Sequence, residues 1–84
     1  MRILFSKRAR SDWQKLDHTI QERLREKLAY FVSQRNSLRY ADKLHEEDLG
    51  GFRFRVGDYR IVFDVEGNSI LVLRVGHRKD IYKK

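Results

Sequence analysis

Three arginines between residues 52 and 60 form the part of the chain best suited to chemistry. The segment reads FRFRVGDYR, so Arg53 and Arg55 alternate with apolar residues, and Arg60 follows the pair Gly57-Asp58. A two-residue loop of this kind predicts a β-hairpin in which Arg55 lies opposite Arg60. Cross-strand partners share a face, and like charges placed there repel each other. Such a cluster therefore indicates an anion site, and phosphate is the anion that suits the guanidinium fork best.

The overall charge of the chain favours the same kind of partner. The 84 residues carry 19 Lys and Arg against 12 Asp and Glu, a formal net charge of +7. So strong a bias on a short chain is typical of proteins that bind a polyanion, most often nucleic acid. An acidic protein partner is compatible with this charge and would be additional.

Composition also excludes several kinds of site. The chain has no cysteine, which rules out disulfides, thiolate zinc sites and a cysteine nucleophile. Its three histidines, His18, His45 and His77, are scattered, and we expect neither a metal site nor a cofactor. The apolar run Ile3-Leu4-Phe5 is too short for a signal peptide, and no stretch approaches the roughly 18 apolar residues of a membrane span. We expect a cytoplasmic protein that does not bind membranes.

The first half of the chain is predicted to be mainly helical. Residues 2–6 read as a short strand, and a helix follows directly. A second helix is predicted from Thr19, which has the capping-box spacing to Glu22, as far as about Gln34. Its apolar stripe consists of Ile20, Leu24, Leu28, Phe31 and Val32. Two such helices in sequence predict an antiparallel helical hairpin.

The second half is predicted to be a three-stranded meander. Residues 35–50 read as a polar connection, and Gly67-Asn68 reads as a second hairpin turn. The tail from residue 76 to residue 84 is too polar for the core, and no C-terminal helix is expected. The predicted strands cover residues 52–56, 59–66 and 69–75. The whole chain, residues 1–84, is therefore expected to be a single α+β domain, in which the helical hairpin packs on one face of a small antiparallel sheet.

These motifs, in this order, resemble the RelE/ParE superfamily of bacterial and archaeal toxins from type II toxin–antitoxin modules, and the RelE branch most of all. The resemblance spans almost the whole chain. It is carried by the segment FSKRARSDWQKLD, the hairpin FRFRVGDYRIVFDV and the ending VLRVGHRKDIYKK. The hairpin and the ending are fairly specific, because V-G-H-R and then I-Y follow the arginine hairpin after one more strand. The resemblance implies the RelE-like fold.

The resemblance also implies an activity and partners. RelE-type toxins cut messenger RNA in the ribosomal A site, where the ribose 2′-hydroxyl attacks the adjacent phosphate without a metal. A cognate antitoxin is implied, and so is binding of the toxin–antitoxin complex to operator DNA. Contacts with ribosomal RNA are expected, and Lys7, Arg8 and Arg10 are candidates for them. The alternatives are a ParE-like poison of DNA gyrase and a catalytically weak nucleic-acid-binding relative.

Carried onto this sequence, the family pattern gives five site residues. The basic pair that binds RNA falls on Arg53 and Arg55, and the catalytic positions fall on Arg60, Arg78 and Tyr82. His77, which sits beside Arg78, is added as a further catalytic candidate because imidazole can exchange a proton near neutral pH. Arg60 and Arg78 would stabilise the phosphorane, and Tyr82 would stack on a base or take part in proton transfer.

The basic pair departs from the family pattern, which often has lysine there. Arginine does not deprotonate in proteins and cannot act as the general base. His77 is the first candidate for that role and Tyr82 the second. The remaining option is that the ribosome orients the RNA and catalysis rests mainly on electrostatics.

Overall fold

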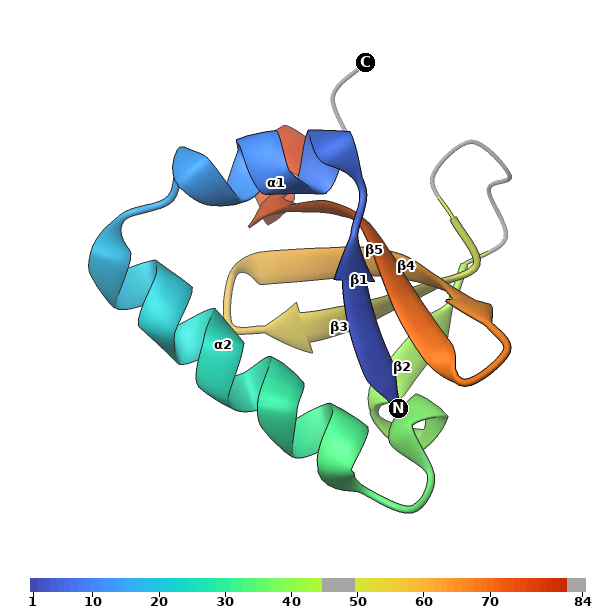
Figure 1. Cartoon of the computed structure of the whole chain (residues 1–84). Helices are drawn as coiled ribbons and strands as arrows, with labels where there is room; N and C mark the ends of the chain where they lie inside the picture. Colours follow the sequence, from blue (N-terminus) through green and yellow to red (C-terminus); the bar gives the residue numbers. More distant parts are fainter. Residues whose placement is uncertain (45–49, 82–84) are drawn as a thin grey trace.

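The chain folds into a five-stranded sheet with helices packed against it (Figure 1). The structure is a computed structural model that describes residues 1–44 and 50–81. Its elements in chain order are β1 (Arg2–Phe5), α1 (Lys7–Gln14), α2 (His18–Ser33), the 3₁₀ helix η1 (Ser37–Tyr40), β2 (Ala41–Lys43), β3 (Phe52–Val56), β4 (Tyr59–Glu66), β5 (Ser69–His77) and α3 (Arg78–Ile81).

The strands follow the order β1-β5-β4-β3-β2 across the sheet. The pairs β3–β4 and β4–β5 are antiparallel, as expected. The pair β2–β3 is also antiparallel, while β1 pairs with β5 in parallel. The α+β class predicted from the sequence is confirmed. The sheet is mixed rather than purely antiparallel, because α1 and α2 intervene between β1 and the meander and β1 lies on the far side of β5.

The core lies between α2 and one face of the sheet. Leu24 and Leu28 of the predicted stripe are buried, and Ile20, Phe31 and Val32 pack around them. On the sheet side, the Phe54 ring stacks between Phe31 and Phe63, with ring centroids 4.6 and 4.4 Å away. The remaining buried members of this cluster are Ala9, Val56, Ile61, Ile70, Val72 and Val75.

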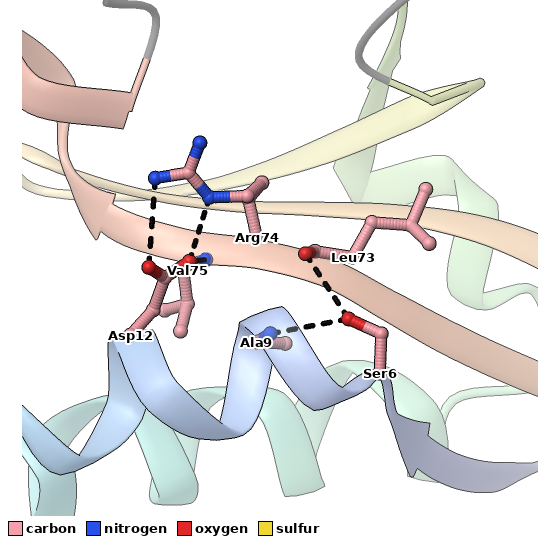
Figure 2. Close-up of polar contacts among 6 residues, drawn as sticks. All are labelled: Ser6, Ala9, Asp12, Leu73, Arg74 and Val75. Carbon is pink, nitrogen blue, oxygen red and sulfur yellow. Dashed lines mark hydrogen bonds and ion pairs between the residues drawn. The ribbon is translucent and has the colours of Figure 1, made fainter.

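Helix α1 closes the free edge of β5 beyond the point where β1 ends (Figure 2). The Ser6 hydroxyl caps the helix by accepting from Ala9 N at 3.1 Å, and it donates to the Leu73 carbonyl at 3.2 Å. One turn further along, an Asp12 oxygen accepts from Val75 N at 3.1 Å. The same oxygen accepts from Arg74 Nε at 2.8 Å. Polar groups of α1 thus take the place of a neighbouring strand and hold the last part of β5.

A β-bulge in β5 decides which side chains face the helices. Phe63 pairs with Val72 and Val62 pairs with Arg74, so Leu73 is left without a partner. Because side chains alternate along a strand, the extra residue reverses the alternation beyond it. Val75 therefore returns to the core, and Arg74 lies on the opposite face.

Three expectations about local structure are wrong. Helix α2 begins at His18 with Asp17 as the N-cap, so Thr19 is already helical. The connection contains β2, a short edge strand that pairs with β3. The tail forms α3, and Ile81 is only 1% exposed. A single apolar side chain can thus anchor a polar tail to the sheet. In the part of the chain that the structure describes, no helix is long and apolar enough to cross a membrane.

Candidate anion-binding site

The register of the β3–β4 hairpin confirms the predicted pairing. Arg55 lies opposite Arg60, and Arg53 lies opposite Val62. Gly57 has a φ of 59°, which the first residue of this two-residue loop needs and which L side chains rarely adopt. Phe54 points into the core between Arg53 and Arg55 in sequence, so the arginines occupy the face of the sheet away from α2. This face is called the arginine face below.

An acidic residue that the sequence analysis did not single out meets two of these arginines. Asp42 lies in β2 opposite Arg53, and its Oδ2 lies 3.2 Å from Arg53 Nε and 2.9 Å from Arg55 Nε. The Asp42 side chain is 39% exposed, so water screens both ion pairs. Part of the positive charge of the predicted RNA-binding pair is therefore balanced within the protein. The sequence signal for Asp42 was absent because β2 itself was not predicted.

Arg60 is held in a different way. Its Nη1 donates to the carbonyls of Gly57 and Tyr59, at 2.8 and 2.9 Å. Within residues 1–44 and 50–81, no carboxylate lies within ion-pair distance of Arg60. The guanidinium is therefore oriented by backbone atoms, and no carboxylate of the described residues neutralises its charge.

Arg78, the first residue of α3, contacts the same hairpin turn from the end of β5. Its backbone N donates to the Asp58 carbonyl at 2.7 Å, and its Nε lies 3.7 Å from Asp58 Oδ1. A methyl group added to Gly57 would lie 2.9 Å from Arg23 Nη2, so α2 brings a further guanidinium to this turn. Arg60, Arg78 and Arg23 thus all lie near this turn.

The structure does not place His77 with Arg60 on the arginine face. His77 lies opposite Tyr59, and the two rings meet edge to face with centroids 5.4 Å apart. Since Tyr59 packs against the core, the His77 ring lies on the helix side of the sheet. Lys79 N donates to His77 Nδ1 at 3.1 Å. A neutral ring in this position carries its proton on Nε2 and can donate there, but has no free nitrogen to accept one.

A pocket of about 380 Å³ opens beside the end of β5. It lies between the C-terminal end of α1 and α3, and its lining includes Lys15, Arg74, Gly76 and His77. The volume falls in the range of about 300–1,000 Å³ that is usual for small-molecule sites. Arg74 enters the lining with its charge paired to Asp12.

Some predicted features lie outside the described residues. Tyr82 and the acidic cluster at residues 45–48 are among these, so the structure assigns them no place. Among the residues that are described, no three His, Asp or Glu side chains gather closely enough to hold a metal ion.

A five-stranded sheet of this order, with α2 packed on one face and the arginine side chains of the β3–β4 hairpin on the other, is the architecture of the RelE-like toxin fold. The fold matches the toxin–antitoxin complex RelBE2 of Mycobacterium tuberculosis with a TM-score of 0.77 at 32% identity, over 94% of this chain and 92% of that chain. It also matches the isolated Escherichia coli RelE toxin with a TM-score of 0.71 at 25% identity, over 90% and 82% of the two chains.

Sequence comparison agrees with the structural match. The chain is 36% identical over 84 residues to the toxin RelG of Mycobacterium tuberculosis, which covers 98% of this chain and 95% of that protein. It is 35% identical over 86 residues to the toxin RelE3 of Methanocaldococcus jannaschii. Residues 3–82 match the family described as ParE toxin of type II toxin-antitoxin system, parDE. The chain belongs to this family, and so to the RelE/ParE superfamily of type II toxins.

Proposed function

We propose that this toxin is a ribosome-dependent endoribonuclease that cuts messenger RNA in the A site and so inhibits translation. One observation carries the proposal. Arg60 and Arg78 converge on one hairpin turn, and Arg60 is oriented by carbonyl oxygens without a carboxylate partner in the described residues. A preorganised guanidinium next to solvent is suited to a phosphate whose charge increases during the reaction.

The proposed reaction is an attack within one strand of RNA. The ribose 2′-oxygen bonds to the adjacent phosphorus, and the bond from phosphorus to the 5′-oxygen breaks. The 2′-hydroxyl loses one proton, the leaving 5′-oxygen gains one, and the products are a 2′,3′-cyclic phosphate and a 5′-hydroxyl. In this proposal Arg60 and Arg78 stabilise the phosphorane, and Arg53 and Arg55 bind the neighbouring RNA backbone. The reaction draws on no cofactor, and the toxin acts in the cytoplasm.

The proton acceptor in this proposal is not the His77 ring as it lies in the structure. Lys79 N occupies Nδ1, and the other ring nitrogen carries the proton in the neutral state. His77 therefore enters the proposal as a hydrogen-bond donor through Nε2. Orientation of the 2′-hydroxyl by the ribosome, with electrostatic stabilisation by the arginines, accounts for the larger part of the rate enhancement. Tyr82 remains the candidate for stacking or proton transfer.

The partners in this proposal are the ribosome with its message and a cognate antitoxin. The solved relatives from Mycobacterium tuberculosis and from Methanococcus jannaschii are toxin–antitoxin complexes, which supports an antitoxin for this chain. Acidic antitoxin side chains over the arginine face would block the phosphate site directly. A double-mutant cycle between the toxin arginines and antitoxin acids tests this, and zero coupling excludes direct masking. The complex is proposed to bind its own operator DNA.

The deciding experiment is cleavage of a programmed message in purified 70S ribosomes, with the 5′ ends mapped. The variants are Arg60→Ala, Arg78→Ala and Tyr82→Phe. Arg35→Ala serves as a matched control, because this exposed arginine follows α2 and also removes one positive charge. Discrete A-site cuts that the Arg60 and Arg78 variants lose and the Arg35 variant keeps would support the proposal. Equal cutting by all variants would overturn the assigned roles.

A second function is favoured by the family description, which names ParE. A ParE-like toxin would poison DNA gyrase without cutting RNA, and the arginine face would then serve as a binding surface. Inhibition of gyrase supercoiling by the purified toxin, together with an intact message on the ribosome, would establish this alternative.

A further inference from the structure

Gly76 is a glycine that the fold itself does not require. It lies in β5, directly opposite Arg60, and it is not among the glycines with positive φ, which are Gly50, Gly57 and Gly67. A Cβ atom built on Gly76 meets no atom of the described residues within 4 Å, its two chain neighbours apart. Neither the backbone conformation nor the packing of the described residues therefore explains the missing side chain.

Glycine at this position has a cost in stability. In a strand it is less favourable than alanine, and it often marks a place where a ligand or another backbone approaches closely. The β-bulge in β5 lies at Leu73 and does not account for Gly76. Because no described atom beyond its chain neighbours approaches Gly76, the absent side chain leaves room for a ligand.

The surroundings of Gly76 indicate what kind of ligand approaches. The row Arg55–Arg60–Gly76 crosses three neighbouring strands, so the bare backbone continues a line of two guanidinium groups. Gly76 also lines the 380 Å³ pocket at the end of β5. Further along the arginine face, Gly50 covers the side chains of Val62 and Leu73. A Cβ at Gly50 would lie 2.9 Å from Leu73 Cδ1 and 3.1 Å from Val62 Cγ1. Among the described residues, the surface left uncovered therefore extends from Arg60 over Gly76 toward the pocket.

We propose that Gly76 is a backbone notch over which the ribose–phosphate chain of single-stranded RNA crosses the sheet, with its phosphate at Arg60 and the adjoining nucleoside in the pocket. This inference rests on the proposed function in taking RNA as the anion. Lys15 and His77 on the pocket wall supply polar groups for a nucleoside, and the absent side chain lets the backbone come within reach of Arg60. Gly76 is a positioning residue, because it acts by leaving space and contributes no reacting group.

The test adds a side chain at position 76 without disturbing the fold. Gly76→Ala and Gly76→Val are compared with Gly67→Asn, which adds a side chain in open space at the other end of β5, where Asn tolerates the φ of 56°. Arg60→Ala is the positive reference. Thermal unfolding followed by circular dichroism is expected to show both Gly76 variants at least as stable as the wild type, since each removes a strand glycine.

Binding is measured by fluorescence anisotropy with a single-stranded RNA hexamer that carries 2′-O-methyl groups and cannot be cut. Gly76→Val is expected to weaken binding about tenfold or more, Gly76→Ala less, and Gly67→Asn less than about twofold. Cleavage on the ribosome is expected to fall about 100-fold for Gly76→Val, because a misplacement of 1 Å costs about that much in rate. A stable Gly76→Val variant that binds and cuts RNA like the wild type would overturn the proposal that RNA crosses the sheet over Gly76.

The two arms separate this inference from the proposed function. The wild type could fail to cut the message and still bind the hexamer, with weaker binding by the Gly76 variants. The nuclease proposal would then fail, and the proposed role of Gly76 in RNA binding would be supported. If the wild type cuts but does not bind the free hexamer, the cleavage rates of the Gly76 variants decide, and rates equal to that of the wild type overturn the notch. If the wild type neither binds the hexamer nor cuts the message, both proposals are overturned.

Discussion

The ion pair between Asp12 and Arg74 is expected to be the polar contact on which the fold depends most. Asp12 is 12% exposed and Arg74 is 19% exposed, with 2.8 Å between Asp12 Oδ2 and Arg74 Nε. Asp12 also accepts from Val75 N at 3.1 Å and from Arg74 Nη2 at 3.5 Å. Replacement with alanine would leave a nearly buried guanidinium and a backbone N–H without their acceptor.

The magnitude follows from the interactions that are lost. Breaking a buried ion pair by removing one partner costs about 3–5 kcal/mol, and an unsatisfied buried donor costs about 1–3 kcal/mol. Because water reaches part of both side chains, we expect Asp12→Ala to lower the free energy of unfolding by about 3 kcal/mol. Asp12→Asn keeps one acceptor oxygen and loses the charge, so about 1–2 kcal/mol is expected. For a domain of this size each kcal/mol lowers Tm by about 4–8 °C.

The assay is urea unfolding followed by circular dichroism, repeated in 0.5 M NaCl. The difference between wild type and Asp12→Ala should persist at high salt, because nearly buried pairs are screened less than exposed ones. Glu26→Ala, an exposed acid on α2, is the matched control, and we expect a change within about 0.5 kcal/mol. A double-mutant cycle with Arg74→Ala should give a coupling energy of at least about 1 kcal/mol. A loss below about 0.5 kcal/mol for Asp12→Ala would refute the reasoning.

Three further predictions concern the arginine face, an exposed tyrosine pair and the core. Asp42→Asn removes the carboxylate charge that Arg53 and Arg55 share, so single-stranded RNA should bind severalfold more tightly at low salt, and the slope of log K against log salt should steepen by about 0.7 for each phosphate gained. Unchanged affinity and slope would contradict this. A hydrogen bond with Tyr30 raises the pKa of Tyr40. Its contribution to stability is therefore present at neutral pH and lost as the pH rises above the ordinary tyrosine value, and Tyr30→Phe should lower the Tyr40 pKa in an absorbance titration at alkaline pH. Phe54→Ala, at a fully buried position, should cost about 3–5 kcal/mol in urea unfolding, and a cost below about 1 kcal/mol would argue against the ring stack as part of the core.

The parts predicted well from sequence are those with a strong local signal. A two-residue turn with glycine at its first position determines the register of the hairpin, so the opposition of Arg55 and Arg60 could be predicted. The apolar stripe of α2 repeats at helical spacing, and its members pack against the sheet as expected. Both signals lie within a few residues of the contacts that they specify.

The parts missed depend on contacts between distant segments. β2 has three residues, reads Ala-Asp-Lys and lacks alternation, so its pairing with β3 leaves no local pattern. Ile81 is one apolar residue in a polar tail, and only the packing of α3 on the sheet makes it part of the interior. The face on which His77 lies depends on the bulge at Leu73, which leaves no local sequence signal, so the sequence could not show that His77 lies apart from Arg60.

The bulge at Leu73 also limits how the length of this segment can change in evolution. From Leu73 onward the chain is offset by one residue, which places Val75 in the core and Gly76 beside Arg60. Loss of one residue between the bulge and the start of α3 would move the remaining side chains of this segment to the opposite face of the sheet. One deletion would therefore remove an apolar side chain from the core and place a side chain in the space beside Arg60. Substitutions can alter the affinity or specificity of this surface one side chain at a time. Insertions and deletions there would disrupt the interior and the surface together, and we expect length variation to be confined to other parts of the chain.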